Sequence, residues 1–155
     1  MSYDKIVRDA HPNDIDEILR LLDLMHGGDR KSRASASEVE LFQQILSQEG
    51  RRILVAENER KVVGTVDVIV TSNLSRDGAP WAMVENLVVD PTLRGRGIGR
   101  ALMSEAIEFA RSKRCYKVQL VSSRSREVAQ GLYRSLGFDA PVDGFRQYLK
   151  SVSLA

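Results

Sequence analysis

The sequence predicts an α/β fold (an α+β mixed sheet) with the element order β-α-α-β-β-β-α-β-α-β-β. Three strand-like runs follow one another between residues 52 and 90 with no helical pattern between them, which favours antiparallel pairing. A helical pattern then separates the last of these runs from the next strand, and such a crossover favours a parallel pair. We therefore expect one sheet that contains both kinds of pairing.

Length and composition predict one globular domain that spans residues 1–155. A chain of 155 residues can bury a core of its own, and its 43% hydrophobic and 28% charged residues are typical of a folded, water-soluble protein. It holds no apolar run of the ~20 residues that cross a bilayer. The N-terminal residues also lack the apolar centre of a signal peptide. We expect a cytoplasmic protein with no membrane partner.

Charge and metal-ligating residues exclude several function classes. The net charge of +2, from 23 basic and 21 acidic residues, is too balanced to indicate nucleic-acid binding, and we expect no nucleic-acid partner. A single cysteine, Cys115, excludes an internal disulfide and a cysteine-based metal cluster. With His11 and His26 as the two histidines, we expect no metal site.

The N-terminal part is expected to form a strand and two helices. Residues 3–10 read as a strand, and residues 11–25 read as a helix that Pro12 opens. Ser37 and Glu40 match a capping box, which predicts a second helix that runs to about Glu49.

The remaining elements follow from alternation, helical periodicity and turn residues. We expect strands at 52–57, 61–71, 81–90 and 115–122, helices at 98–110 and 125–138, and two final strands, the last at 143–152. The Asp90–Pro91 pair ends the third of these strands because proline has no N–H to donate. Gly137 is expected to end the last helix.

A glycine-rich segment, "LRGRGIG", lies between a predicted strand and a predicted helix. Glycine loses more conformational freedom on folding than any other residue, yet Gly95, Gly97 and Gly99 occupy alternate positions here. They can turn the unpaired N–H groups of the helix start toward one point, where the helix dipole also attracts an anion. A diphosphate suits this site, and three cations are near enough in sequence to contact it: Arg94, Arg96 and Arg100.

Other phosphate-binding loops do not match this spacing. A Walker loop requires Gly-x-x-x-x-Gly-Lys-Ser/Thr, which the sequence lacks. A Rossmann loop requires Gly-x-Gly-x-x-Gly and a later carboxylate, whereas this segment reads Gly-x-Gly-x-Gly and the next strand carries none.

The segment resembles the signature of the GCN5-related N-acetyltransferases (GNAT family), Arg/Gln-x-x-Gly-x-Gly/Ala, at Arg94, Gly97 and Gly99. The strand "ENLVVDP" before it and "VAQGLYRSLGF" after it are also similar to that family, in the same order. The resemblance covers nearly the whole chain. It implies a V-shaped split between the fourth and fifth strands.

The resemblance implies acetyl-CoA as co-substrate, held without a metal. The pantetheine arm would pair with the strand at Leu87, Val88 and Val89. The diphosphate would lie on the segment formed by Arg94, Gly95, Arg96, Gly97, Ile98, Gly99 and Arg100. Many family members carry an asparagine where this chain has Arg126, so the contact of Arg126 with the cofactor must differ, because arginine cannot accept a hydrogen bond.

The same resemblance assigns two catalytic candidates. Tyr133 matches the family tyrosine that protonates the leaving sulfur, and a phenol remains a proton donor at neutral pH. Glu85 is a candidate base for the amine, although a carboxylate needs burial to become a good one. Aromatic packing is the structural alternative for Tyr133, and a solvated strand face is the alternative for Glu85. Cys115 reads as a small buried hydrophobe, so we expect direct transfer in a ternary complex.

The predicted function is transfer of an acetyl group to a primary amine of a small molecule or peptide. Another acyl group or acceptor is the alternative within enzymes, and a non-catalytic acyl-CoA-binding or sensory module is the alternative outside them. The acceptor depends on loops at 26–36 and 73–80 and on the C-terminal hairpin, whose composition names no substrate. The cations Arg30, Lys31 and Arg33 hint at an anionic acceptor, and a homodimer is common among similar proteins.

Overall fold

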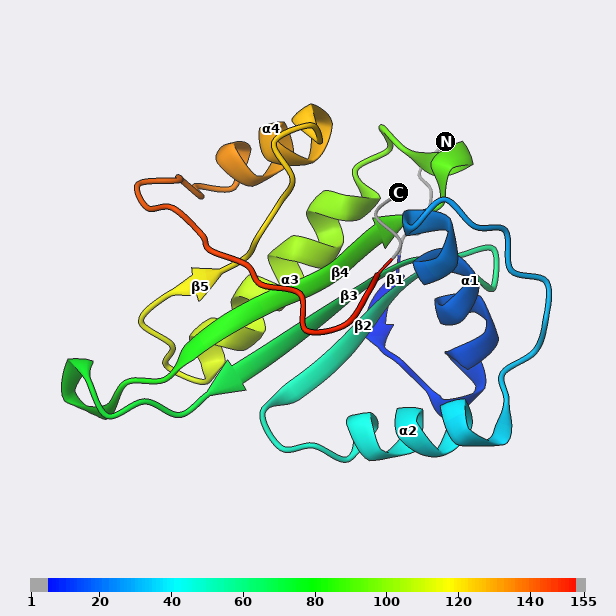
Figure 1. The fold of residues 1–155 in the computed structure, drawn as a ribbon, viewed down its shortest axis with the longest axis horizontal. Coiled ribbons are helices and arrows are strands. Elements are labelled where there is room, and N and C mark those ends of the chain that lie inside the picture. The colour runs from blue at the N-terminus through cyan, green and yellow to red at the C-terminus, as the bar shows by residue number, and fades with distance from the viewer. Residues whose placement is uncertain (1–5, 153–155) are drawn as a thin grey trace.

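The computed structural model describes residues 6–152 and has one five-stranded sheet with the strand order β1-β2-β3-β4-β5 (Figure 1). The strands are β1 (Ile6–Asp9), β2 (Arg51–Asn58), β3 (Lys61–Thr71), β4 (Trp81–Val89) and β5 (Val118–Gln119). The helices are α1 (Ile15–Met25), α2 (Ala36–Leu46), α3 (Ile98–Ser112) and α4 (Glu127–Ser135). Short 3-10 helices are η1 (Pro12–Asp14), η2 (Arg76–Gly78) and η3 (Pro91–Leu93).

The sheet is mixed, as predicted. Strands β1 to β4 pair antiparallel with their neighbours in sequence, and β4 pairs parallel with β5 after the crossover through α3. The parallel pairing joins Ala82 to Val118 and Met83 to Gln119. Beyond Met83, β4 continues for six residues, to Val89, while β5 has ended. The fourth and fifth strands therefore separate where the sequence led us to expect a split.

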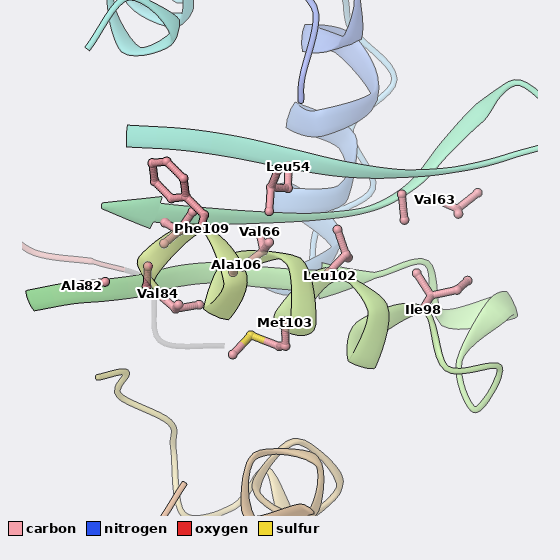
Figure 2. Packing of buried hydrophobic residues seen from close by; sticks show 13 residues of the cluster. Leu54, Val63, Val66, Ala82, Val84, Ile98, Leu102, Met103, Ala106 and Phe109 are labelled. Atoms are coloured by element: carbon pink, nitrogen blue, oxygen red, sulfur yellow. The ribbon is translucent and has the colours of Figure 1, made fainter. Parts of the chain in front are cut away.

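Both faces of the sheet are covered by helices. Figure 2 shows Leu54, Val66 and Leu102 among the side chains gathered between the sheet and α3. On the other face, Leu21 of α1 and Phe42 of α2 join a second buried cluster. Apolar burial on the two faces fixes the register of the strands, because a strand shifted by one residue would exchange the side chains that the two cores receive.

A β-bulge in β4 reverses that alternation. Glu85 faces Asp67 and Val88 faces Thr65, so two residues of β4 lie opposite one residue of β3. Asn86 takes the left-handed conformation that the extra residue requires, with φ at 57°. Val84 consequently belongs to the core under α3, whereas Val88, four residues later, belongs to the core under α1.

The two final strands predicted after the last helix are not formed among residues 136–152. This part of the chain is almost entirely exposed, and Phe145 has 97% of its surface accessible. Within residues 143–152, apolar residues occur at positions 145, 148, 149 and 152, which is not the alternation that lets a strand bury one face. The prediction for 143–152 is therefore wrong for the described residues.

Near the N-terminus, one predicted boundary falls outside the described residues and another differs from prediction. The predicted first strand includes residues 3–5, which lie outside the described residues, and β1 begins at Ile6. The second helix begins after Ser35, not Ser37: the Ser35 hydroxyl accepts from the Glu38 N–H, and the Glu38 carboxylate accepts from the Ser35 N–H. Both serines have a glutamate three residues later, so the pattern alone could not choose between them.

Leu102→Ala should lower the free energy of unfolding by about 3 kcal/mol, because the lost side chain leaves a cavity between α3 and the sheet. Leu102 is 0% exposed. Chemical denaturation measures the change. Leu41→Ala is the matched control, since Leu41 is 55% exposed on α2, and it should change stability by less than about 0.5 kcal/mol. Equal losses in the two variants would contradict this account of the core.

Candidate functional site

The chain leaves the sheet at Asp90, directly after β4. The Asp90 N–H donates to the Val63 carbonyl at 2.8 Å and ends the pairing with β3. Pro91 has no N–H to continue the sheet, and the Asp90 side chain accepts from the Thr92 N–H at 3.0 Å. This turn, η3, directs the chain across the end of β4 into the glycine segment.

The glycine segment adopts the backbone conformation for which glycine is needed. Gly95 has φ at 75° and Gly97 has φ at 77°, in the left-handed region that other residues rarely enter. Gly97 is the N-cap of α3, so the first N–H groups of that helix follow it. No side chain within residues 6–152 caps them, whereas Ser35 caps α2. Their donors are thus oriented by the helix and left for a ligand.

Gly99 has a second purpose, which is close packing between helices. A Cβ atom at Gly99 would lie 3.3 Å from Leu132 Cδ2 and 3.7 Å from Val89 Cγ2. The absence of a side chain lets α4 approach α3 at this point. The two helices then form opposite walls of one cleft.

The cleft has a volume of about 670 Å³ and runs along the end of β4, between the starts of α3 and α4. It is lined by Leu87, Val88, Val89, Leu93, Arg94, Gly95, Gly97, Ile98, Gly99, Arg100, Ser125, Arg126, Glu127, Val128, Ala129, Leu132 and Tyr133. Strand residues supply an apolar floor, and two helix N-termini and three arginines supply positive potential. Such a site suits an elongated ligand with an anionic end.

The cleft brings together every predicted cofactor-binding residue except Arg96. Two of its arginines already have partners in the protein. Arg94 Nε donates to the Val89 carbonyl at 3.4 Å, and Arg100 donates to the Ser135 hydroxyl at 2.6 Å. Arg100 therefore links α3 to α4 across the cleft.

Tyr133 lies half-buried in the cleft wall, as a residue of α4. Burial raises the pKa of its hydroxyl, the Arg126 charge opposes that shift, and the Glu85 carboxylate adds to it. The phenol is therefore kept protonated at neutral pH. Gly137 ends the helix as predicted, and Phe138 returns to contact the Tyr133 ring, with 6.1 Å between the ring centroids.

Glu85 does not line the cleft. It is exposed on β4, directly opposite Asp67 of β3, and it lies just before the bulge. Asp67 is buried and is neutralised by Arg51, whose guanidinium donates to both carboxylate oxygens, at 3.0 and 2.5 Å. The Glu85 charge nevertheless contributes to the raised pKa of the Tyr133 phenol.

Arg126 is the N-cap residue of α4 and lines the cleft, although its side chain makes no cap hydrogen bond. Its charge lies near enough to Tyr133 to oppose the rise in the pKa of the phenol. A cation at this position can contact an anionic ligand but cannot replace the acceptor of an asparagine amide.

Part of the cleft wall consists of residues that were not predicted from the sequence. The additional lining residues are Leu93, Ser125, Glu127, Val128, Ala129 and Leu132. Three of them, Glu127, Val128 and Ala129, belong to the first turn of α4, whose N-terminus lies at the cleft as that of α3 does. Helical spacing in "REVAQGLY" could have placed Ala129, Leu132 and Tyr133 on adjoining faces.

The loop after α1 uses Arg30 for its own structure. The guanidinium of Arg30 donates to both oxygens of Glu38, at 2.8 and 2.9 Å, and to the carbonyls of Ser32 and Arg33. The Arg30 ion pair, with the Ser35 N–H, lowers the pKa of Glu38 to about 2. The hydrogen bonds of Arg30 thus stabilise the loop itself, which argues against a role for Arg30 in binding an anionic acceptor.

Cys115 is partly buried, and burial raises the pKa of its thiol, which makes it a poor nucleophile at neutral pH. Residues 6–152 contain no group of three His, Cys, Asp or Glu side chains arranged to hold a metal ion. Over the same range, no helix has the length and apolar character that crossing a membrane requires.

The residues of the cleft fit an acyl-CoA. A Cβ atom at Gly95 would meet no heavy atom within 4 Å, so the space beside this glycine is open to a ligand. The uncapped N–H groups of α3 can receive the diphosphate. Leu87 and Val89, which the bulge turns toward α3, border the unpaired part of β4, where an extended pantetheine arm can bind.

Comparison with known proteins decides the family. Residues 15–138 match the model of the Acetyltransferase (GNAT) family. The chain belongs to the GNAT family. A putative acetyltransferase from Agrobacterium tumefaciens shares this GNAT fold, with a TM-score of 0.85 and 33% sequence identity over 92% of this chain and 99% of that one.

Two curated relatives match part of the GNAT chain. A glucosamine 6-phosphate N-acetyltransferase of Trypanosoma brucei brucei is 40% identical over 80 residues, which is 52% of each protein. N-acetyltransferase 8B of Homo sapiens is 39% identical over 93 residues, which is 60% of this chain and 40% of that protein. The chain thus spans about half or less of the length of these relatives.

Gly97→Leu should abolish binding of CoA, because a side chain on the left-handed N-cap of α3 would be strained and would obstruct the N–H donors. Isothermal titration calorimetry with CoA measures the loss. Gly78→Leu is the matched control: Gly78 has φ at 76° in η2, outside the cleft, and a Cβ atom there has ordinary clearance. Normal CoA binding by Gly97→Leu would contradict the assigned anion site.

Proposed function

We propose that this protein transfers an acetyl group from acetyl-CoA to a primary amine of a small molecule or peptide, directly in a ternary complex. The observation that carries the proposal is the cleft, in which uncapped helix donors, an unpaired strand edge and a protonated tyrosine lie together. Membership of the GNAT family supports the reaction type.

Each part of the cleft suits one part of acetyl-CoA. The N–H groups from Gly97 to Arg100 would bind the diphosphate, with Arg94 and Arg126 as further cations. The backbone of β4 from Leu87 to Val89 would pair with the amides of the pantetheine arm. Arg100 would contribute if its guanidinium leaves Ser135.

The proposed reaction needs one acid and one base. The amine nitrogen attacks the thioester carbonyl carbon, the carbon–sulfur bond breaks, and an amide and CoA result. The departing sulfur takes a proton from the Tyr133 hydroxyl. The amine loses one proton before attack and one on becoming an amide, so one of them restores Tyr133 and the other is released to solvent.

Glu85 is proposed as the group that receives protons from the amine. Its carboxylate is exposed on β4. It can act as an anchor for a water chain and as a negative charge that attracts an ammonium group. The electrostatic influence of Glu85 on Tyr133 supports a common region for the two.

Similarity to an enzyme that acetylates an amino sugar favours a small-molecule amine as acceptor. The Trypanosoma relative is a glucosamine 6-phosphate N-acetyltransferase, which acts on a primary amine of a phosphorylated sugar. We extend to this chain the coarser class, a primary amine, and keep another acyl group or acceptor as the alternative. A cytoplasmic location and a homodimer stay predictions from the sequence.

A direct test combines ligand binding with turnover. Purified protein should be stabilised more by CoA than by ADP in a thermal-shift experiment, because CoA also fills the strand-edge groove. Release of free thiol from acetyl-CoA should then depend on an added amine from a panel that includes amino sugars, polyamines and peptides. Binding without turnover on any amine would favour a sensory module, and equal stabilisation by ADP and CoA would favour a nucleotide-binding protein.

Tyr133→Phe should lower turnover by about 100-fold or more, because the sulfur loses its proton donor. The dissociation constant for CoA should stay nearly unchanged, since the ring and its packing are retained. Steady-state kinetics and calorimetry separate the two effects. Tyr116→Phe is the control, because Tyr116 lies outside the cleft beside Lys117. Unaltered turnover in Tyr133→Phe would remove this residue from the acid role.

A further inference from the structure

Both carboxylate oxygens of Asp90 accept hydrogen bonds at the point where the chain enters the glycine segment. Oδ1 accepts from the Thr92 N–H at 3.0 Å and from the Thr92 hydroxyl at 2.7 Å. Oδ2 accepts from Arg20 Nη1 at 3.1 Å. Asp90 therefore fixes the first turn after β4 and attaches it to a residue 70 positions earlier in the chain.

Arg20 is presented by a rigid element. It belongs to α1, whose neighbouring side chain Leu21 is fully buried in the same core cluster as Val88 of β4. Arg20 Nε also donates to Glu17 at 3.0 Å, one turn earlier, which orients the guanidinium. The Arg20 and Asp90 side chains are 27% and 18% exposed, so water screens this pair less than it screens a surface pair.

The turn that Asp90 holds leads directly into the cleft. The Leu93 N–H donates to the Asp90 carbonyl at 2.9 Å, and both Leu93 and Arg94 line the cleft. Gly95 and Gly97 follow, and glycines give the backbone many alternative conformations. The path of the backbone at Leu93 and Arg94 therefore determines whether the N–H groups that follow point toward one ligand site.

The charge of Asp90 also needs compensation. Burial alone would raise the pKa of Asp90, but hydrogen bonds from Thr92 and Arg20 outweigh it and lower the pKa, so the carboxylate is ionised at neutral pH. An unpaired carboxylate this close to an anion-binding loop would repel the ligand. Arg20 offsets that charge without entering the cleft, since it is not among the lining residues.

We infer that Arg20 and Asp90 form a positioning pair that aligns the glycine segment for the diphosphate of acyl-CoA. The inference rests on the proposed function. It assigns a role to α1, which contributes no lining residue to the cleft.

The test uses two single variants, the double variant and one control. Arg20→Met removes the cation and keeps most of the aliphatic stem. Asp90→Asn keeps an oxygen that can cap Thr92 and removes the charge that binds Arg20. Glu17→Gln removes the other partner of Arg20 and leaves the pair with Asp90 in place.

Calorimetry with CoA should show about fivefold weaker binding for each single variant. The double variant should lose no more affinity than the single variant that binds CoA more weakly, because both substitutions break the same interaction. Glu17→Gln should bind CoA with near wild-type affinity. Amide hydrogen exchange over residues 92–100 should be faster in Arg20→Met. Pantetheine, which lacks the diphosphate, should bind to wild type and variants alike by nuclear magnetic resonance.

The readouts distinguish positioning from stability alone. A merely structural pair would lower the unfolding temperature and leave CoA binding to the folded protein unchanged, and that result would overturn the inference. Additive effects in the double variant, or equal weakening by Glu17→Gln, would overturn it as well. If the wild-type protein does not bind CoA, the proposed function fails too; if it binds CoA and the variants bind equally well, only the positioning pair fails.

Discussion

One extra residue in β4 is the constraint on which the cleft depends. Without the bulge at Asn86, Val84 and Val88 would share a face, and one of the two cores would lose a side chain. With the bulge, Val84 packs in the core under α3 and Val88 packs in the core under α1. Leu87 and Val89 then face the cleft. Natural proteins use bulges in this way to redirect side chains beside functional sites.

The bulge acts together with the short β5. Since β5 pairs with β4 at Ala82 and Met83, β4 is held at its start by both neighbours and at its end by β3 alone. The unpaired edge has backbone donors and acceptors that need partners. Gly99 then lets α4 close the space from the far side through Leu132. Backbone geometry thus shapes the cleft before any charged side chain contributes to it.

The sequence predicted the elements whose causes are local. Helix α3 follows from its apolar period and the glycines before it, and Gly137 ends α4 through a backbone turn that depends on a few neighbouring residues. The bulge could not be predicted, because it depends on the register between β3 and β4, and no glycine marks Asn86. The strand expected at 143–152 has apolar residues but no strict alternation, so the strand pattern was too weak there to predict the structure.

Electrostatics divide the site between two faces of the sheet. The cleft collects positive potential from the starts of α3 and α4 and from its arginines, which suits an anionic cofactor. Glu85 and the Arg51–Asp67 pair lie on the other face of β4, where Arg51 neutralises Asp67. An ammonium group approaching from that side would meet the negative charge of Glu85. The two charges nevertheless act on one group, the Tyr133 phenol, because Arg126 opposes the rise in its pKa and Glu85 adds to that rise.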